Sequence, residues 1–108
     1  SLSSERTFSE NIATLPALLP VMRGMLEGVR EELARKHADR AVRSLVVKLK
    51  FADFTRTTAE RAHPVVEPSI YEELLGEAWK RGRGRAVRLL GVGVRFRDPD
   101  EGGQLEMF

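Results

Sequence analysis

Residues 80–97 combine a strand-like alternation with a run of positive charge that no acid interrupts. Large apolar side chains recur at every second position: Leu90, Val92, Val94 and Phe96. Successive side chains of a strand point to opposite faces, so these four predict one apolar face. The opposite face then carries leucine, glycine or arginine: Leu89, Gly91, Gly93, Arg95 and Arg97. Such a strand indicates a sheet that is covered on one side only.

A second segment, residues 42–51, alternates in the same way. Its apolar positions are Leu45, Val47, Leu49 and Phe51, and the positions between them are Ser44, Val46, Lys48 and Lys50. Residues 55–61 are rich in threonine, which favours strands, and they follow a short corner at 52–54. They predict a strand that returns antiparallel to the previous one. Residues 1–8 alternate more weakly and predict a first strand.

Two segments show the three-and-four spacing of an amphipathic helix. Residues 14–37 carry apolar side chains on one face, and Pro20 either kinks this helix or moves its start to about residue 17. A second helix opens at Pro68-Ser69, where Ser69 and Glu72 fit a capping box. Trp79 is expected to anchor the core from this helix. The helix should end at the glycines that follow residue 81.

The predicted order is therefore β-α-β-β-α-β, an α+β fold. Two helices would cover one face of a four-stranded sheet, and the other face would stay open. The open face would carry basic side chains: Lys48, Lys50, Arg56, Arg95 and Arg97. At 108 residues the chain predicts one domain over residues 1–97, followed by a flexible acidic and glycine-rich tail at 98–108.

The composition excludes several classes of site. The chain has no cysteine, so it has no disulfide, zinc-thiolate site or thiol nucleophile. Common catalytic and nucleotide-binding motifs are absent, and the acids are not placed to hold a metal ion. We therefore expect a binding chain with no catalytic residue, metal ligand or cofactor of its own. A concentrated basic run is typical of phosphate binding.

The ends of the chain and its hydropathy add two expectations. No apolar run approaches the ~18 residues that cross a bilayer, so no membrane contact is expected. The chain starts at Ser1 with neither an initiator methionine nor a signal peptide. We expect it to be cut from a longer protein.

Five segments, in order along the chain, resemble one known family. They are residues 3–8, residues 47–54 with Thr57 and Thr58, residues 79–85, residues 87–92 and residues 104–108. Together they resemble the C-terminal little-finger (polymerase-associated) domain of a bacterial Y-family DNA polymerase of the DNA polymerase IV type. The resemblance covers essentially the whole chain and implies the fold derived above.

The resemblance implies that the sheet lies in the DNA major groove near the primer–template junction. It would grip the backbone without sequence preference, through strand amides and basic side chains. The implied DNA-binding residues are Ser4, Arg6, Thr7, Lys48, Lys50, Arg56, Arg85, Arg88, Gly91 and Arg95. Arg88 is the best single candidate for a phosphate contact, although the alternation puts it on the apolar face. A bulge near Leu89, or a strand that begins after Arg88, would resolve this conflict.

The parent protein would be a translesion DNA polymerase that uses magnesium and acts in DNA repair and replication. Its catalytic carboxylates would lie in a palm domain outside this chain. The resemblance further implies a monomer located in the bacterial cytoplasm, in association with the nucleoid.

The chain ends in a segment that resembles the peptide by which bacterial polymerases bind the sliding clamp. Its implied clamp-binding residues are Gln104, Leu105, Met107 and Phe108. Gln104 would form a hydrogen bond at the edge of a pocket that the three apolar side chains fill. Affinity in such contacts is concentrated in a few anchors.

Two other functions fit the predicted fold. A stand-alone ferredoxin-like RNA-binding module would need exposed aromatic side chains for stacking, and the predicted open face offers none because Phe51 and Phe96 share the apolar face. A purely structural interaction domain would leave the basic strand unexplained.

Overall fold

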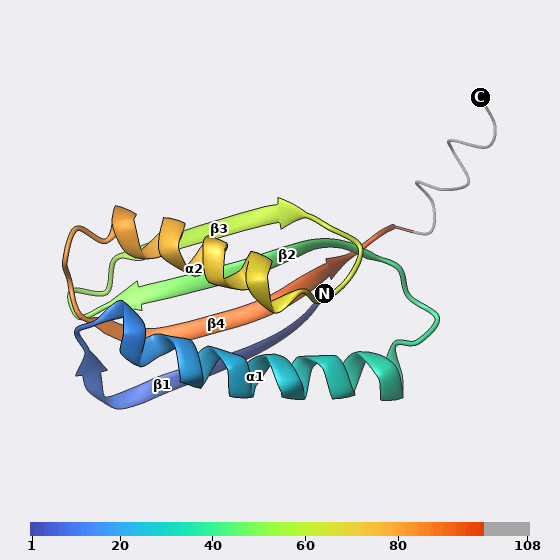
Figure 1. Cartoon of the computed structure of the whole chain (residues 1–108), viewed down its shortest axis with the longest axis horizontal. Helices are drawn as coiled ribbons and strands as arrows, with labels where there is room; N and C mark the ends of the chain where they lie inside the picture. The colour runs from blue at the N-terminus through green and yellow to red at the C-terminus, as the bar shows by residue number, and fades with distance from the viewer. Residues whose placement is uncertain (99–108) are drawn as a thin grey trace.

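The structure, a computed structural model, describes residues 1–98 (Figure 1). Its elements are β1 (Leu2–Ile12), α1 (Leu15–Lys36), β2 (Val42–Phe51), β3 (Arg56–Ala62), α2 (Pro68–Arg81) and β4 (Val87–Phe96). The four strands form one antiparallel sheet in the order β1-β4-β2-β3. The predicted α+β fold with β-α-β-β-α-β order is confirmed.

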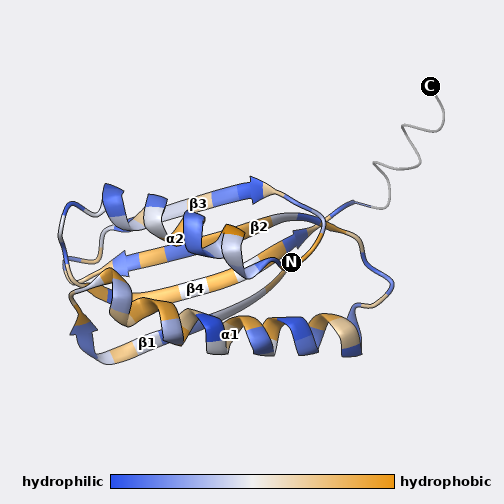
Figure 2. Ribbon diagram, in the orientation of Figure 1, coloured by the Kyte–Doolittle hydropathy of each residue, from blue (hydrophilic) through white to orange (hydrophobic). Residues whose placement is uncertain are grey.

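Both helices lie on the same side of the sheet, and its other side is open (Figure 1). α1 packs on β1 and β4, whereas α2 packs on β2 and β3. Hydrophobic residues concentrate on the two central strands, and β3 at the edge is largely hydrophilic (Figure 2). The core therefore lies between the helices and the central strands.

The pairing of β2 with β4 confirms the alternation predicted for both strands. Leu45 lies opposite Val94, Val47 opposite Val92 and Leu49 opposite Leu90. All six side chains are buried against the helices. Their neighbours along each strand consequently point to the open face.

A β-bulge at Arg88 resolves the conflict in the sequence pattern. Lys50 pairs with Leu89 but the next residue, Phe51, pairs with Val87, so Arg88 is the extra residue of β4. Val87 and Leu90 are both fully buried although they are three residues apart. The bulge thus returns the apolar side chains to the core and releases Arg88 from the apolar face.

The helix termini differ in two ways from the sequence-based expectation. α1 begins at Leu15 and contains Pro20, so the alternative start near residue 17 is wrong. The predicted capping box is also wrong, because α2 has Glu67 at its N-cap without a side-chain cap. Glu72 instead forms an ion pair with Arg23 of α1, 2.9 Å from Nη2 to Oε1.

The tyrosine of α2, not its tryptophan, is the deeply buried aromatic side chain of the helix. Tyr71 is fully buried and its hydroxyl donates a 2.7 Å hydrogen bond to the carbonyl of Gly93 in β4. Burial raises the pKa of Tyr71 well above its ordinary value of 10.0, so the hydroxyl remains a donor. Trp79 is only half-buried and packs at the margin of the core.

Two glycines of the α2 region have opposite surroundings. A Cβ at Gly82, the C-cap of α2, would overlap the ring of the fully buried Phe51. A Cβ at Gly76, inside the helix, would meet nothing within 4 Å. Phe51 therefore packs directly against the backbone at the end of α2.

We predict that Gly82→Ala lowers the free energy of unfolding by about 1–3 kcal/mol, because the added methyl group displaces the Phe51 ring. Gly76→Ala is the matched control and should raise it by up to about 1 kcal/mol, since alanine favours the helix. Urea unfolding of the two variants measures both effects. Wild-type stability in Gly82→Ala would contradict the close packing of Phe51 on Gly82.

Candidate nucleic-acid interface

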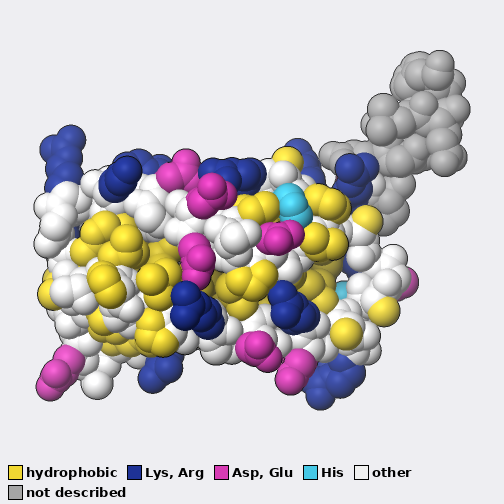
Figure 3. All heavy atoms as spheres, in the orientation of Figure 1, with side chains coloured by type: hydrophobic (Ala, Val, Ile, Leu, Met, Phe, Trp, Pro, Cys, Tyr) yellow, Lys and Arg dark blue, Asp and Glu magenta, His cyan; other side chains and the backbone are white. Residues whose placement is uncertain are grey.

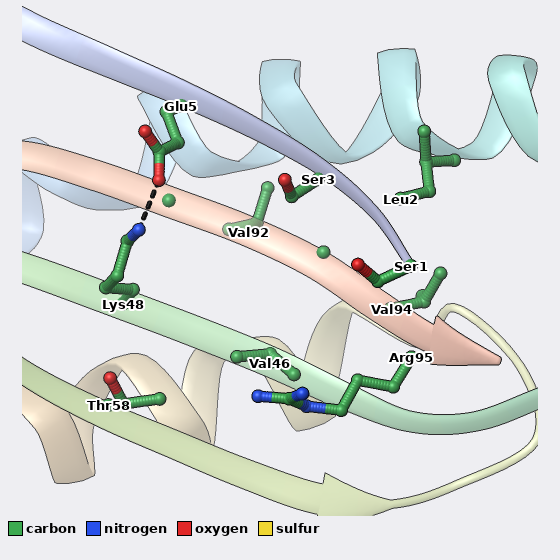
Figure 4. Close-up of a pocket in the computed structure, with 12 residues that line it drawn as sticks. Ser1, Leu2, Ser3, Glu5, Val46, Lys48, Thr58, Val92, Val94 and Arg95 are labelled. Atoms are coloured by element: carbon green, nitrogen blue, oxygen red, sulfur yellow. Dashed lines mark ion pairs between the residues drawn. The ribbon is translucent and has the colours of Figure 1, made fainter.

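The open face of the sheet is the candidate binding surface. Residues that lie directly opposite each other on neighbouring strands share a face. On the open face, Gly91 of β4 lies opposite Lys48 of β2, and Gly93 lies opposite Val46. A shallow hollow of about 210 Å³ lies over these glycines, edged by the start of β1 and by Arg95 (Figure 4). Arg97 follows the end of β4 and its N–H donates to the carbonyl of Ala41, 2.8 Å away.

The two cations beside this hollow each have a carboxylate partner. Lys48 and Glu5 point toward each other across β4 and form an ion pair (Figure 4). Arg95 lies 3.1 Å from Glu60, measured from Nε to Oε1, and Ser44 donates a hydrogen bond to the same carboxylate. The centre of the open face is therefore close to neutral, and the sequence-based picture of a uniformly basic face is too simple.

Positive charge gathers at one end of the open face, the end at left in Figure 1 where β2 turns into β3 and α2 leads into β4. Lys50 pairs with Arg56 on one side and with Leu89 on the other, next to the bulged Arg88. Within residues 1–98, no carboxylate forms an ion pair with Lys50, Arg56 or Arg88. We call these three residues the basic cluster.

Phe54 lies at the edge of the basic cluster and was missed by the sequence reasoning. The residue is 58% exposed. Lys50 Nζ and Arg88 Cζ lie over its ring, 4.9 and 4.8 Å from the centroid. The sequence contains one indication that Phe54 is unusual: it is an aromatic residue inside a polar turn, where large apolar side chains are uncommon.

Arg85, a predicted DNA contact, is engaged in the turn between β2 and β3. Its Nε lies 3.3 Å from Oδ2 of Asp53, and its Nη1 donates a 2.8 Å hydrogen bond to the Thr55 hydroxyl. The hydroxyl and then the backbone N–H of Thr55 hold the pKa of Asp53 below its ordinary value of 3.8 by donating hydrogen bonds, and Arg85 acts in the same direction. Arg85 thereby braces the turn that carries Phe54.

The three candidates from β1 divide between the faces of the sheet. Thr7 pairs with Leu89 and lies on the open face. Ser4 pairs with Val92 and Arg6 with Leu90, which places both on the helix-covered side. Thr7 is thus the only one of the three whose side chain shares a face with the basic cluster.

The two glycines of β4 differ in how closely other atoms approach them. A Cβ at Gly93 would lie 2.5 Å from the carbonyl oxygen of Leu2, so the edge strand β1 approaches too closely for a side chain. A Cβ at Gly91 would sit 3.4 Å from Cγ of Glu5, an ordinary contact. Packing explains Gly93 but does not explain Gly91.

The helix-covered side carries charges of both signs, with Lys and Arg interspersed among Asp and Glu (Figure 3). Arg61 of β3 pairs with Glu73 and Glu77 of α2, and Lys36 pairs with Glu32 of α1. Among residues 1–98, no group of three or more His, Asp or Glu side chains could hold a metal ion, and no helix is long and apolar enough to cross a membrane.

Comparison with known proteins identifies the family. Residues 1–107 match the impB/mucB/samB family C-terminal domain. The chain is 31% identical to the protein in a solved complex described as the β-clamp processivity factor and little finger domain of PolIV, with a TM-score of 0.83 over 90% of this chain and 88% of that one. The chain belongs to this family. It is a little finger domain of the DNA polymerase IV type, as the sequence motifs predicted.

Two curated relatives are DNA polymerase IV of Vibrio cholerae, 38% identical, and of Pseudomonas putida, 39% identical. Both matches cover all of this chain, which spans about 30% of the length of either relative. A solved ternary complex of Dbh DNA polymerase has the same fold, with a TM-score of 0.73 at 17% identity over 87% of this chain and 27% of that one. The predicted clamp-binding residues Gln104, Leu105, Met107 and Phe108 lie outside the described residues.

The contrast between Gly91 and Gly93 predicts different effects of the same substitution. Gly93→Ala should lower the free energy of unfolding by about 1–3 kcal/mol, because its methyl group collides with β1. Gly91→Ala should stay within about 0.5 kcal/mol of wild type. Thermal unfolding of the two variants tests this, and equal stability of both would show that β1 does not restrict Gly93.

The lowered pKa of Asp53 predicts a pH dependence. Because the pKa is lower in the folded chain than in the unfolded chain, the ionised carboxylate stabilises the fold above about pH 4, and this contribution is lost as the pH falls through the folded value. The stability difference between wild type and Asp53→Asn should shrink over that range. Carboxyl NMR titration checks the cause directly, and an Asp53 that titrates at or above 3.8 would contradict it.

Proposed function

We propose that this little finger domain is a non-catalytic module of a translesion polymerase. It would bind the primer–template DNA and would attach the polymerase to the sliding clamp. The observation that carries the DNA-binding part is the basic cluster of Lys50, Arg56 and Arg88 on the open face. Like charges that lie directly opposite each other on a sheet destabilise it, and Lys50 and Arg56 are such a pair. A polyanion across the strands would compensate for this repulsion.

DNA phosphates are the ligand that suits this arrangement. The phosphates of one strand repeat along the duplex, so cations on adjacent antiparallel strands can contact successive phosphates. Contacts to phosphate position a protein on DNA but carry no base information. The domain would therefore hold the backbone of any sequence, and Gly91, which packing does not require, would allow the backbone a closer approach.

The neighbouring candidates have weaker roles in this proposal. Lys48 and Arg95 would contact phosphate only in competition with Glu5 and Glu60. Thr7 would add a hydroxyl from the same face, whereas Ser4 and Arg6 could contribute only from the edge of β1. Arg85 would act mainly through the turn.

The RNA-binding alternative receives no support. The strands of the sheet present no aromatic side chain on the open face, because Phe51 is fully buried and Phe8 and Phe96 pack against the core. The exposed Phe54 lies in the turn, beyond the strands. The curated relatives are DNA polymerases.

The parent protein would be a DNA-directed DNA polymerase of the bacterial cytoplasm that carries its magnesium-binding carboxylates in another domain. The names of the curated relatives support this, and the chain corresponds to about 30% of their length. On this view, residues 1–97 form the DNA-binding domain and residues 98–108 a tether. The domain would act as a monomer within its polymerase.

The clamp-binding part of the proposal rests on the sequence of residues 104–108 and on the related little finger domain solved with a β-clamp. Gln104 would bind at the rim of an apolar pocket, and Leu105, Met107 and Phe108 would fill it. The apolar anchors would supply most of the affinity.

We predict that Lys50→Ala and Arg88→Ala each weaken binding to a primer–template duplex by about tenfold, because each removes a charge-assisted phosphate contact. Each should also reduce the slope of log affinity against log salt by about 1. The controls are Lys36→Ala and Arg35→Ala, which remove the same residue types from the end of α1. Fluorescence anisotropy at several salt concentrations measures all four.

The controls should bind DNA like wild type, and the losses should not depend on base sequence. Equal losses in all four variants would indicate a general effect of net charge. Unchanged affinity in Lys50→Ala and Arg88→Ala would remove the basic cluster from the DNA interface.

We predict that the triple variant Leu105→Ala, Met107→Ala, Phe108→Ala loses binding to a bacterial sliding clamp and keeps wild-type affinity for DNA. The alanines leave the length and charge of the chain unchanged, so the apolar anchors alone are tested. Co-elution with the clamp in gel filtration and anisotropy with DNA provide the two readouts. Retained clamp binding would exclude these residues as the anchors.

A further inference from the structure

Phe54 has a backbone conformation that its side chain does not favour. Its φ is 68°, in the left-handed region that glycine and asparagine adopt most easily. The residue is also 58% exposed, so burial in the core does not offset the strain. A strained aromatic residue on the surface suggests a role other than stability.

The surrounding turn holds Phe54 in place. The Phe51 N–H donates to the carbonyl of Thr55 at 2.9 Å, and the Phe54 N–H donates to the carbonyl of Phe51 at 2.8 Å. This leaves a three-residue loop whose last member is left-handed, a position that glycine commonly fills in such hairpins. Asp53, Thr55 and Arg85 brace the same turn from outside.

The ring of Phe54 lies under two of the three residues of the basic cluster. Lys50 comes from β2 and Arg88 from the bulge of β4, yet their charged groups lie 4.9 and 4.8 Å from one ring centroid. The negative face of an aromatic ring attracts cations at this range. The ring can therefore keep together two like charges that would otherwise repel each other and explore many rotamers.

We propose that Phe54 is a positioning residue that holds Lys50 and Arg88 together over the open face, so that they receive the DNA backbone as one preorganised anion-binding site. This inference rests on the proposed DNA-binding function. Phe54 does not itself contact the phosphates. It reduces the conformational freedom that the two long side chains would otherwise lose on binding.

A stacking role for Phe54 is the competing explanation. An unpaired template base would stack on a face of the ring, and Lys50 and Arg88 already lie over that ring. Stacking on a face that a cation covers would require that cation to move away. The structure favours positioning, and a preference for single-stranded DNA is the result that separates the two roles.

The test uses Phe54→Asn, which suits the left-handed turn and removes the ring, and Phe54→Tyr, which keeps the ring. Phe54→Asn should weaken binding to duplex DNA about three- to tenfold, with a melting temperature close to wild type. Phe54→Tyr should bind like wild type. Val65→Ala, at the other strongly exposed apolar side chain of residues 1–98, is the control and should leave DNA affinity unchanged.

A double-mutant cycle gives the readout that a purely structural role would not move. Once Lys50 and Arg88 are both alanine, adding Phe54→Asn should cause no further loss of affinity. A further loss in that background, or a loss confined to single-stranded DNA, would overturn positioning in favour of stacking. Wild-type affinity of Phe54→Asn for duplex DNA would overturn the inference. The proposed function would stand in that case if Lys50→Ala and Arg88→Ala bind DNA more weakly than wild type. If those two variants also bind DNA like wild type, the proposed interface fails as well.

Discussion

The pairing of β2 with β4 is the constraint on which the rest of the structure depends. It brings Leu45, Val47 and Leu49 together with Val94, Val92 and Leu90 on one face, and both helices pack there. Because side chains alternate along a strand, the same register sends Lys48 and Lys50 to the other face. The bulge at Arg88 then adds one arginine to that face without exposing Val87. The apolar core and the candidate DNA surface are therefore two consequences of one register.

The open face is divided by its acids. Glu5 from one edge strand and Glu60 from the other neutralise Lys48 and Arg95 at the centre of the face. At the end near the turn, no carboxylate of residues 1–98 forms an ion pair with the basic cluster. The strained Phe54 lies beneath two of its side chains. Unpaired like charges and a strained backbone both lower stability. Their coincidence at one end of the sheet supports the proposal that this end binds DNA.

The sequence predicted the features that depend on periodicity and missed those that depend on contacts across the sheet. Alternation was sufficient to assign the six apolar side chains that pair between β2 and β4, but not Val87, which the bulge at Arg88 turns into the core. The motifs identified the little finger family. The partners of Lys48 and Arg95 come from strands more than 30 residues away, and their register follows from packing that no local pattern encodes. Tyr71 went unrecognised because its hydroxyl marks it as polar, although its hydrogen bond to Gly93 allows full burial. The capping box failed because α2 begins at Pro68, which places Glu67 and not Ser69 at the N-cap, and Glu72 pairs with Arg23 of the other helix.

The most direct test of the central claim is an amide chemical-shift map of this chain during titration with a short primer–template duplex. We expect the largest shifts at residues 50, 54–56 and 88, smaller ones at residues 48 and 95, and no response in α1. Duplexes of unrelated sequence should give the same pattern, because phosphate contacts carry no base information. Shifts that are largest on the helix-covered side, or at the centre of the open face with residues 50 and 88 unaffected, would exclude the basic cluster as the DNA contact.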